Sequence, residues 1–171
     1  IQVRSGDRIH ITGNNGSGKT TLVKLLLGEL KPAAGTITRA GFSYRYIDQE
    51  CSVLDPGLTV FEQTERFNAS HLAEHELKSI LNRCLFPYET WDKPCFCLSG
   101  GEKIRLLFCC LMIGNNAPDV FILDEPTNNL DIQSVEIITA AIKSYRGTVL
   151  LISHDHYFVK EIKLRKVGIT V

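Results

Sequence analysis

The sequence lacks a net charge, a long apolar run and the patterns of targeting segments. Its 171 residues carry 19 lysines and arginines against 19 aspartates and glutamates, so no overall field draws the chain to nucleic acid or an anionic membrane. No apolar stretch reaches the length of about 20 residues that a membrane-spanning helix needs. No signal-peptide pattern opens the chain. We therefore expect one globular domain with a sizeable core and no membrane segment. No direct nucleic-acid site is evident, although a balanced charge leaves open a basic patch on one face.

The sequence also lacks the cysteine spacings of metal knuckles and redox motifs. Cys95 and Cys97 are one residue apart and Cys109 and Cys110 are adjacent, whereas zinc and redox sites use C-x-x-C. The adjacent pair lies in an apolar helical run, where a reduced cysteine behaves as a small hydrophobic residue. We predict reduced, structural thiols, and hence a cytoplasmic setting. The six cysteines are Cys51, Cys84, Cys95, Cys97, Cys109 and Cys110.

Strands and one helix are predicted up to residue 47, and helices alone from residue 51 to residue 98. Residues 9–12 alternate as a strand does, and the helix after them carries leucines at helical spacing and ends near Gly28. Residues 35–38 and 42–47 are predicted to form two short strands. Residues 51–98 lack long β-rich runs, and their apolar residues recur at helical spacing.

The second half is predicted to alternate helices with buried strands. Ser99 and Glu102 form a capping box at the start of an apolar helix. Residues 120–123 and 148–152 are continuous apolar runs, which are typical of strands covered on both faces. A helix separates them, and a last strand ends the chain. This order predicts an α/β fold with a mostly parallel sheet flanked by helices.

A phosphate loop is predicted between the first strand and the first helix. Residues 13–20 match G-x-x-x-x-G-K-[ST], in which glycines let successive backbone N–H groups turn toward phosphates. Lys19 is then placed to contact the β- and γ-phosphates and Thr20 to bind Mg²⁺, at the positive end of the helix dipole. The predicted nucleotide-binding residues are Gly13, Asn14, Asn15, Gly16, Ser17, Gly18, Lys19, Thr20 and Thr21.

Two carboxylates stand together at the end of the apolar strand 120–123. Asp124 and Glu125 need a counter-charge, which a Mg²⁺ ion supplies. Asp124 is then a candidate metal ligand, acting through water, and Glu125 a candidate acceptor of a proton from the attacking water. The alternative is a solvated loop, because Pro126-Thr127-Asn128-Asn129 follows.

Two further segments are informative only in combination with these. His154 follows the second buried strand and is either a sensor of the γ-phosphate or an ordinary capping residue, and Gln49 is unremarkable by itself. At Leu98–Glu102 a capping box and two glycines expose backbone N–H groups at a helix N-terminus, where anions bind. Ser99 and Gly101 can reach a phosphate there, which we expect to come from a partner molecule.

These motifs, taken in their order along the chain, resemble those of the nucleotide-binding domain of ABC ATPases. The resemblance implies a P-loop NTPase (RecA-like) fold in which two domains enclose two ATP molecules head to tail. It assigns catalysis to Glu125, His154 and Gln49, and the metal to Thr20, Gln49 and Asp124. The residues that contact nucleotide across the pair are then Ser99, Gly100, Gly101 and Glu102.

Two stretches resemble one branch, the ABC-F class of soluble tandem ATPases, which act on the ribosome in translation or antibiotic resistance. These are Glu102-Lys103-Ile104-Arg105 and Glu125-Pro126-Thr127-Asn128-Asn129-Leu130-Asp131. The resemblance implies a second ABC domain as partner, in the same parent chain or as a homodimer, and the ribosome through the parent protein. The alternatives are the nucleotide-binding domain of an ABC transporter and a sensor that holds ATP without hydrolysis.

The resemblance also implies a domain organisation. We expect an ATP-binding core of residues 1–50 and 99–171 with a helical subdomain, 51–98, inserted into it. The chain starts inside an expected strand, so we expect a single ABC domain cut from a longer protein. The family's N-terminal antiparallel strands, with the aromatic residue that stacks on adenine, are then missing, and ATP hydrolysis by the isolated piece is expected to be weak.

Overall fold

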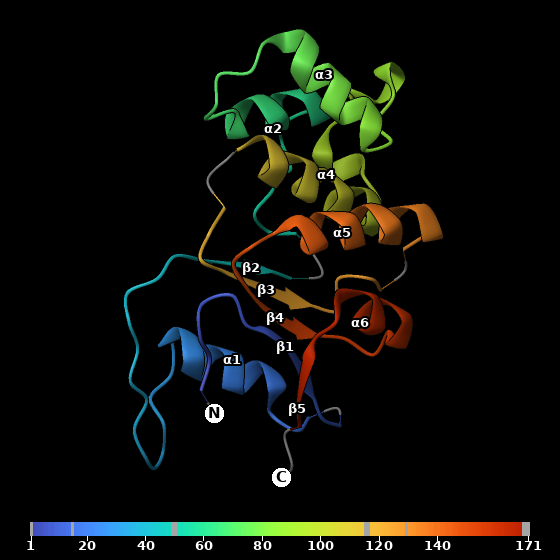
Figure 1. The fold of residues 1–171 in the computed structure, drawn as a ribbon. Helices are drawn as coiled ribbons and strands as arrows, with labels where there is room; N and C mark the ends of the chain where they lie inside the picture. Colours follow the sequence, from blue (N-terminus) through green and yellow to red (C-terminus); the bar gives the residue numbers. More distant parts are fainter. Residues whose placement is uncertain (1, 15, 49–50, 115–116, 129, 169–171) are drawn as a thin grey trace.

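The computed structural model describes residues 2–14, 16–48, 51–114, 117–128 and 130–168. Helices and strands alternate along most of the chain (Figure 1). In chain order the elements are β1 (Arg8–Thr12), α1 (Lys19–Leu27), β2 (Tyr44–Ile47), α2 (Val60–Phe67), α3 (Glu74–Arg83), the 3-10 turns η1 (Tyr88–Thr90) and η2 (Cys95–Cys97), α4 (Gly100–Ile113), β3 (Val120–Asp124), α5 (Ile132–Ser144), β4 (Thr148–Ile152), α6 (His156–Ile162) and β5 (Arg165–Gly168).

The five strands form one sheet in the order β2-β3-β4-β1-β5, and every pair in it is parallel. The register is level at the carboxyl ends, because Ile152 of β4 lies opposite Ile11 of β1 on one side and Asp124 of β3 on the other. The predicted parallel α/β fold is therefore confirmed. Three strands deliver the segments that follow them to one edge of the sheet.

Helices cover both faces of the sheet, as the continuous apolar runs predict. Ile122, Leu150 and Ile152 pack with Val23 of α1 on one face. The alternating residues of the same strands pack on the other face, with side chains from α4, α5 and α6; they are Phe121, Leu123, Val149 and Leu151. Figure 1 shows α1 below the sheet and α4 and α5 above it.

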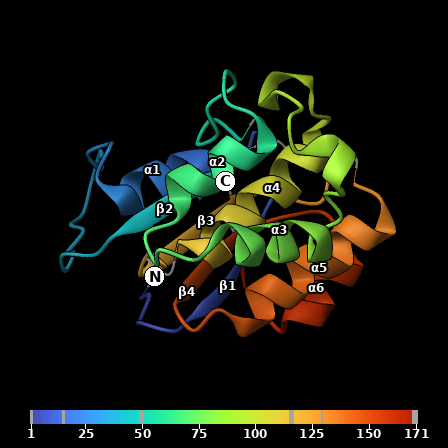
Figure 2. The same ribbon diagram turned by 90° about the horizontal axis from the view of Figure 1, so that it is seen from above.

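The remaining helices form a group above α4. Figure 1 shows α2 and α3 on the side of α4 that faces away from α1, and Figure 2 looks down on these helices from above. Leu77 and Leu81 of α3 are fully buried with Phe86 and Trp91, which continues the hydrophobic core into this group. Among the described residues, none of the helices is long and apolar enough to cross a membrane.

Local sequence signals place several element ends correctly. Helix α1 ends at its predicted stop, Gly28, whose N–H donates to the carbonyl of Leu25. The Ser99–Glu102 capping box is present at the start of α4. These ends depend on residues close in sequence, which is why a pattern can predict them.

Two predictions about secondary structure are wrong. Residues 35–38 are not a strand, and β2 begins at Tyr44 rather than at residue 42. A strand forms only where a neighbour accepts its hydrogen bonds, and within the described part of the chain β2 pairs with β3 alone. Helix α6 was not predicted; it is seven residues long and is held by an Asp155 N-cap and by the buried Phe158 and Ile162.

The cysteines are free thiols, as predicted, and all but Cys97 are buried. Burial raises the pKa of Cys51 to about 12 and that of Cys95 to about 11. Burial also raises the pKa of Cys110 well above its usual range. These thiols are buried and poorly ionised at neutral pH. Because the thiolate is the nucleophile, we expect them to react slowly.

We predict that a maleimide at neutral pH modifies a single cysteine of the native chain, Cys97, and all six after denaturation in guanidinium. Intact-mass spectrometry counts the adducts in each case. The Cys97→Ser variant is the control and should take up none while folded. Rapid modification of a second cysteine in the native protein would contradict the packing of the helices described above.

Candidate functional site

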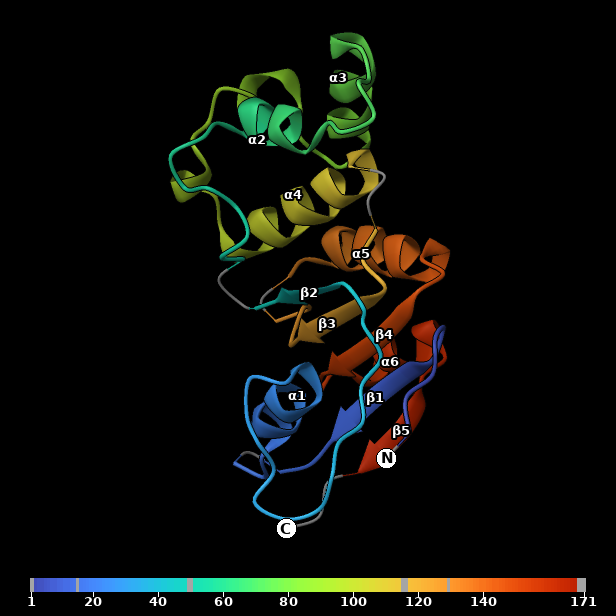
Figure 3. The ribbon, with the colours of Figure 1, turned by 90° about the vertical axis from the view of Figure 1, so that its left-hand side faces the viewer.

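The predicted motifs meet at the carboxyl edge of the sheet. Thr12 ends β1 and leads into the phosphate loop, Asp124 ends β3, and Ile152 ends β4 just before His154. These strands are neighbours in level register. Parallel α/β sheets bind ligands at this edge. Figure 3 shows β3 and β4 pointing to the side of the molecule on which α4 begins.

The phosphate loop folds as a compact turn. Gly16 and Gly18 have φ values of 79° and 85°, in the left-handed region that glycine adopts without strain. The Lys19 ammonium donates to the carbonyl oxygens of Gly13, at 2.9 Å, and Asn14, at 3.0 Å. The loop therefore closes over its own lysine, at the end of β1 and the start of α1.

Several features of this loop fit a phosphate. Gly18 caps α1 without a side-chain hydrogen bond, and no acidic residue lies in the first turn. The Ser17 Oγ is buried and has no hydrogen-bond partner in the described part of the chain. Thr20 and Thr21 are exposed at the start of the helix, and Asn15 lies outside the described residues. An anion there would meet free backbone N–H groups and the positive end of the helix dipole.

Asp124 is held by a residue that the sequence analysis did not single out. The Tyr46 hydroxyl, from β2, donates a 2.7 Å hydrogen bond to Asp124 Oδ2. Burial and this hydrogen bond raise the pKa of Tyr46 well above its usual range, so the hydroxyl stays protonated and remains a donor. The sequence offers no local signal for this contact, because the pairing of β2 with β3 is seen only in the folded chain. Gln49, three residues further on, lies outside the described residues.

Glu125 and His154, predicted to act together, are in contact. Glu125 Oε2 accepts the backbone N–H of His154 at 3.2 Å, and Oε1 lies 3.5 Å from His154 Nε2. The Glu125 side chain is 11% exposed, whereas that of His154 is 66% exposed. Glu125 has φ 50°, an uncommon value for a residue other than glycine, and its N–H donates to the carbonyl of Ile152. Such backbone strain is concentrated at functional sites.

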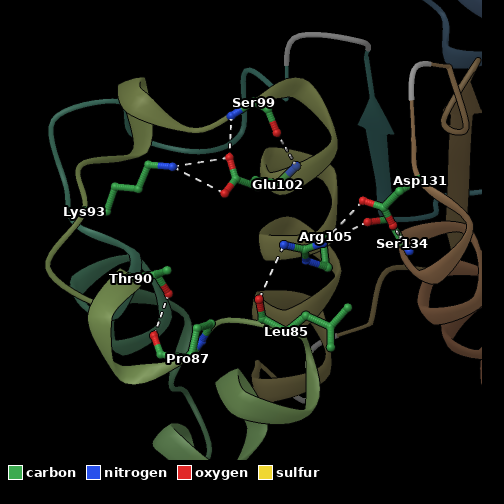
Figure 4. A network of polar contacts seen from close by, with 9 residues as sticks. All are labelled: Leu85, Pro87, Thr90, Lys93, Ser99, Glu102, Arg105, Asp131 and Ser134. Carbon is green, nitrogen blue, oxygen red and sulfur yellow. Dashed lines mark hydrogen bonds and ion pairs between the residues drawn. The ribbon is translucent and has the colours of Figure 1, made fainter.

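The Leu98–Glu102 segment starts α4, in the opposite helical layer from α1. Ser99 Oγ accepts the N–H of Glu102 at 3.2 Å, and Glu102 Oε2 accepts the N–H of Ser99 at 2.7 Å (Figure 4). Partial burial raises the pKa of Glu102, but the hydrogen bonds with Ser99 and the Lys93 ammonium outweigh burial and lower the pKa overall. Its carboxylate is thus engaged in the cap, while Ser99 and Gly100 are exposed and Gly101 is partly buried.

Arg105 connects α4 to the start of α5. Its Nη1 donates to Ser134 Oγ at 2.8 Å and its Nη2 to the carbonyl of Leu85 at 3.4 Å (Figure 4). The guanidinium carbon lies 4.9 Å from the centre of the Phe86 ring, and Asp131, the N-cap of α5, lies 4.0 Å from Nη1. Helix α4, whose N-cap is Ser99, is therefore attached to the start of α5, where the segment that follows Glu125 ends.

Comparison with known proteins agrees with this geometry. The sequence profile of the family described as ABC transporter matches residues 1–128. The chain belongs to this family. It is an ABC ATPase domain, and the predicted P-loop fold and family are confirmed.

F-class proteins are among the relatives of this ABC domain. It is 40% identical over 168 residues to the probable ATP-binding protein YbiT of Escherichia coli O157:H7, and 40% identical over 172 residues to ABC transporter F family member 5 of Arabidopsis thaliana. These matches cover 96% and 99% of the chain. They cover 31% and 24% of the relatives, so the chain spans roughly a quarter to a third of their length.

A solved structure shows the same fold. The archaeal ribosome recycling factor aABCE1, in complex with the ribosomal stalk protein aP1, superimposes with a TM-score of 0.75 at 27% identity. The match covers 97% of this ABC domain and 32% of that chain.

We predict that Arg105→Ala lowers the free energy of unfolding by about 2–4 kcal/mol, because it removes buried contacts to Ser134 and Phe86 and leaves the Ser134 hydroxyl unpaired. Urea denaturation followed by circular dichroism measures the change. The control is Arg66→Ala, which removes an ion pair whose side chains are 55% and 45% exposed. It should cost at most about 1 kcal/mol. Equal losses would contradict the connecting role of Arg105.

Proposed function

We propose that this ABC domain binds and hydrolyses ATP within an ABC-F-like protein. It pairs head to tail with a second ABC domain and drives an ATP-dependent conformational switch on the ribosome, in the cytoplasm. The observation that carries the proposal is the convergence of the phosphate loop, Asp124, and the Glu125–His154 contact at one edge of the sheet.

The proposed roles follow from the positions of these side chains. Lys19 exchanges its two backbone carbonyl contacts for phosphate oxygens, and the backbone N–H groups at the start of α1 bind the same phosphates. Thr20, Gln49 and Asp124 hold Mg²⁺, which neutralises charge on the phosphates when bound. Glu125 accepts the proton of the attacking water, and His154 contacts the γ-phosphate.

The positions of α1 and α4 support pairing with a second domain. The phosphate loop leads into α1 on one face of the sheet, whereas α4 belongs to the layer on the other face (Figure 1). Ser99 and Gly100 are exposed at the start of α4. A second domain placed head to tail adds its Ser99–Glu102 segment to the nucleotide held by the first. Closure on ATP and opening after hydrolysis then form a two-state switch.

The relatives support the ribosome as the place where this switch acts. One similar structure is that of a ribosome recycling factor, and a relative at 40% identity is named as an F family member. The net charge of the chain is zero, so we assign ribosome contacts to other parts of the full protein.

We predict that Glu125→Gln in the full protein lowers the rate of ATP hydrolysis at least about a hundredfold, because the amide cannot accept the proton of the water. Affinity for ATP should change less than about threefold, since the phosphate loop is untouched. Phosphate release and equilibrium binding measure the two effects. The control is Glu136→Gln, an exposed carboxylate on α5. Substantial residual hydrolysis by Glu125→Gln would refute the proton-acceptor role.

The ribosomal part of the proposal has its own test. The full protein carrying Glu125→Gln should sediment with ribosomes through sucrose in the presence of ATP and not of ADP, because the variant stays closed on ATP. The same protein carrying Lys19→Ala as well is the control and should stay in the supernatant. Absence of sedimentation by a variant that binds ATP would contradict the ribosomal role and favour the motor domain of a transporter.

A further inference from the structure

The roles proposed above assign nothing to Tyr46, although its hydroxyl contacts Asp124. Tyr46 of β2 lies opposite Ile122 of β3, two residues before Asp124. Since residues two apart on a strand share a face, Tyr46, Ile122 and Asp124 belong to one face of the sheet. Ile122 packs in the cluster that contains Val23 of α1, and Tyr46 packs against that cluster. The Asp124 carboxylate therefore lies on the face that α1 covers.

The hydrogen bond fixes the orientation of this carboxylate. The phenol donates to Oδ2 at 2.7 Å, an ordinary length for a hydrogen bond from a hydroxyl to a carboxylate. Tyr46 is partly buried against the cluster, so packing restrains its side chain. With Oδ2 engaged, Oδ1 is left for a metal ion or its water. The Asp124 carboxylate and the Thr20 hydroxyl at the start of α1 are both oxygen ligands of the kind that Mg²⁺ prefers.

We propose that Tyr46 is a positioning residue for divalent metal in this domain: it holds Asp124 in the orientation in which the carboxylate serves Mg²⁺·ATP. The inference deepens the proposed function and rests on it. Outer-shell hydrogen bonds of this kind typically change metal affinity by about 10–100-fold.

The test is the Mg²⁺ dependence of nucleotide binding by Tyr46→Phe. Fluorescence of methylanthraniloyl-ATP is titrated with the chain, first in excess EDTA and then at increasing Mg²⁺. We expect the affinity in EDTA to stay within about twofold of wild type, and the Mg²⁺ concentration at half-effect to rise about tenfold or more. A loss of packing alone would weaken both affinities together.

Tyr44→Phe is the matched control. Tyr44 lies two residues earlier on the same strand, and its hydroxyl donates to Glu29 at 3.3 Å rather than to Asp124. It should leave the Mg²⁺ requirement unchanged. A double-mutant cycle with Asp124→Asn separates direct from indirect effects: if Tyr46 acts through Asp124, Tyr46→Phe adds no further change in the Asp124→Asn background.

Three outcomes distinguish the inference from the function beneath it. An unchanged Mg²⁺ requirement in Tyr46→Phe, with wild type binding Mg²⁺·nucleotide, overturns the inference and leaves the proposed function intact. Equal effects of Tyr46→Phe with and without Asp124→Asn also overturn it. A wild-type chain whose nucleotide binding ignores Mg²⁺ overturns both.

Discussion

The site depends on the level register of three parallel strands. Hydrogen bonding between β1, β4 and β3 sets Ile11, Ile152 and Asp124 at one height, which brings their three following segments to the same edge. A slip of one residue in β3 would turn Asp124 to the opposite face and Glu125 into the strand. The apolar side chains on both faces prevent that slip, because it would expose them to the wrong helical layer.

The same register separates the roles of the two carboxylates. Asp124 is the last residue of β3 and stays on the face of α1, where the Tyr46 hydroxyl holds it. Glu125 is the first residue beyond the strand, and its backbone turns to φ 50°. Its side chain then reaches the N–H of His154 on the segment after β4. One carboxylate is thus fixed by a neighbouring strand and the other by a neighbouring loop, which suits a metal ligand and a base respectively.

The sequence predicts those parts of the molecule that local chemistry determines. The phosphate loop, the Gly28 helix stop and the Ser99–Glu102 cap each depend on residues a few positions apart, and all three are present. The buried strands followed from apolar runs because a parallel sheet is covered on both faces. The prediction of a strand at residues 35–38 was wrong because strand pairing depends on a partner distant in sequence, which no local pattern indicates.

Long-range contacts were out of reach of the sequence for the same reason. Tyr46 and Asp124 are 78 positions apart, and Arg105 and Ser134 are 29 apart, so only the assembled sheet and helices reveal these bonds. Gln49 and Asn15 lie outside the described residues, so their proposed roles remain predictions. The relatives at 40% identity establish the family, while the assignment of each side chain rests on the geometry of this chain.

The most direct test of the account is a crystal structure of the Glu125→Gln variant with Mg²⁺·ATP. We predict that the phosphates lie on the loop of residues 13–20, that the metal contacts Thr20 and reaches Asp124 directly or through water, and that the γ-phosphate lies between Lys19 and the side chains at positions 125 and 154. Nucleotide bound away from the carboxyl edge, or a metal with no link to Asp124, would contradict it.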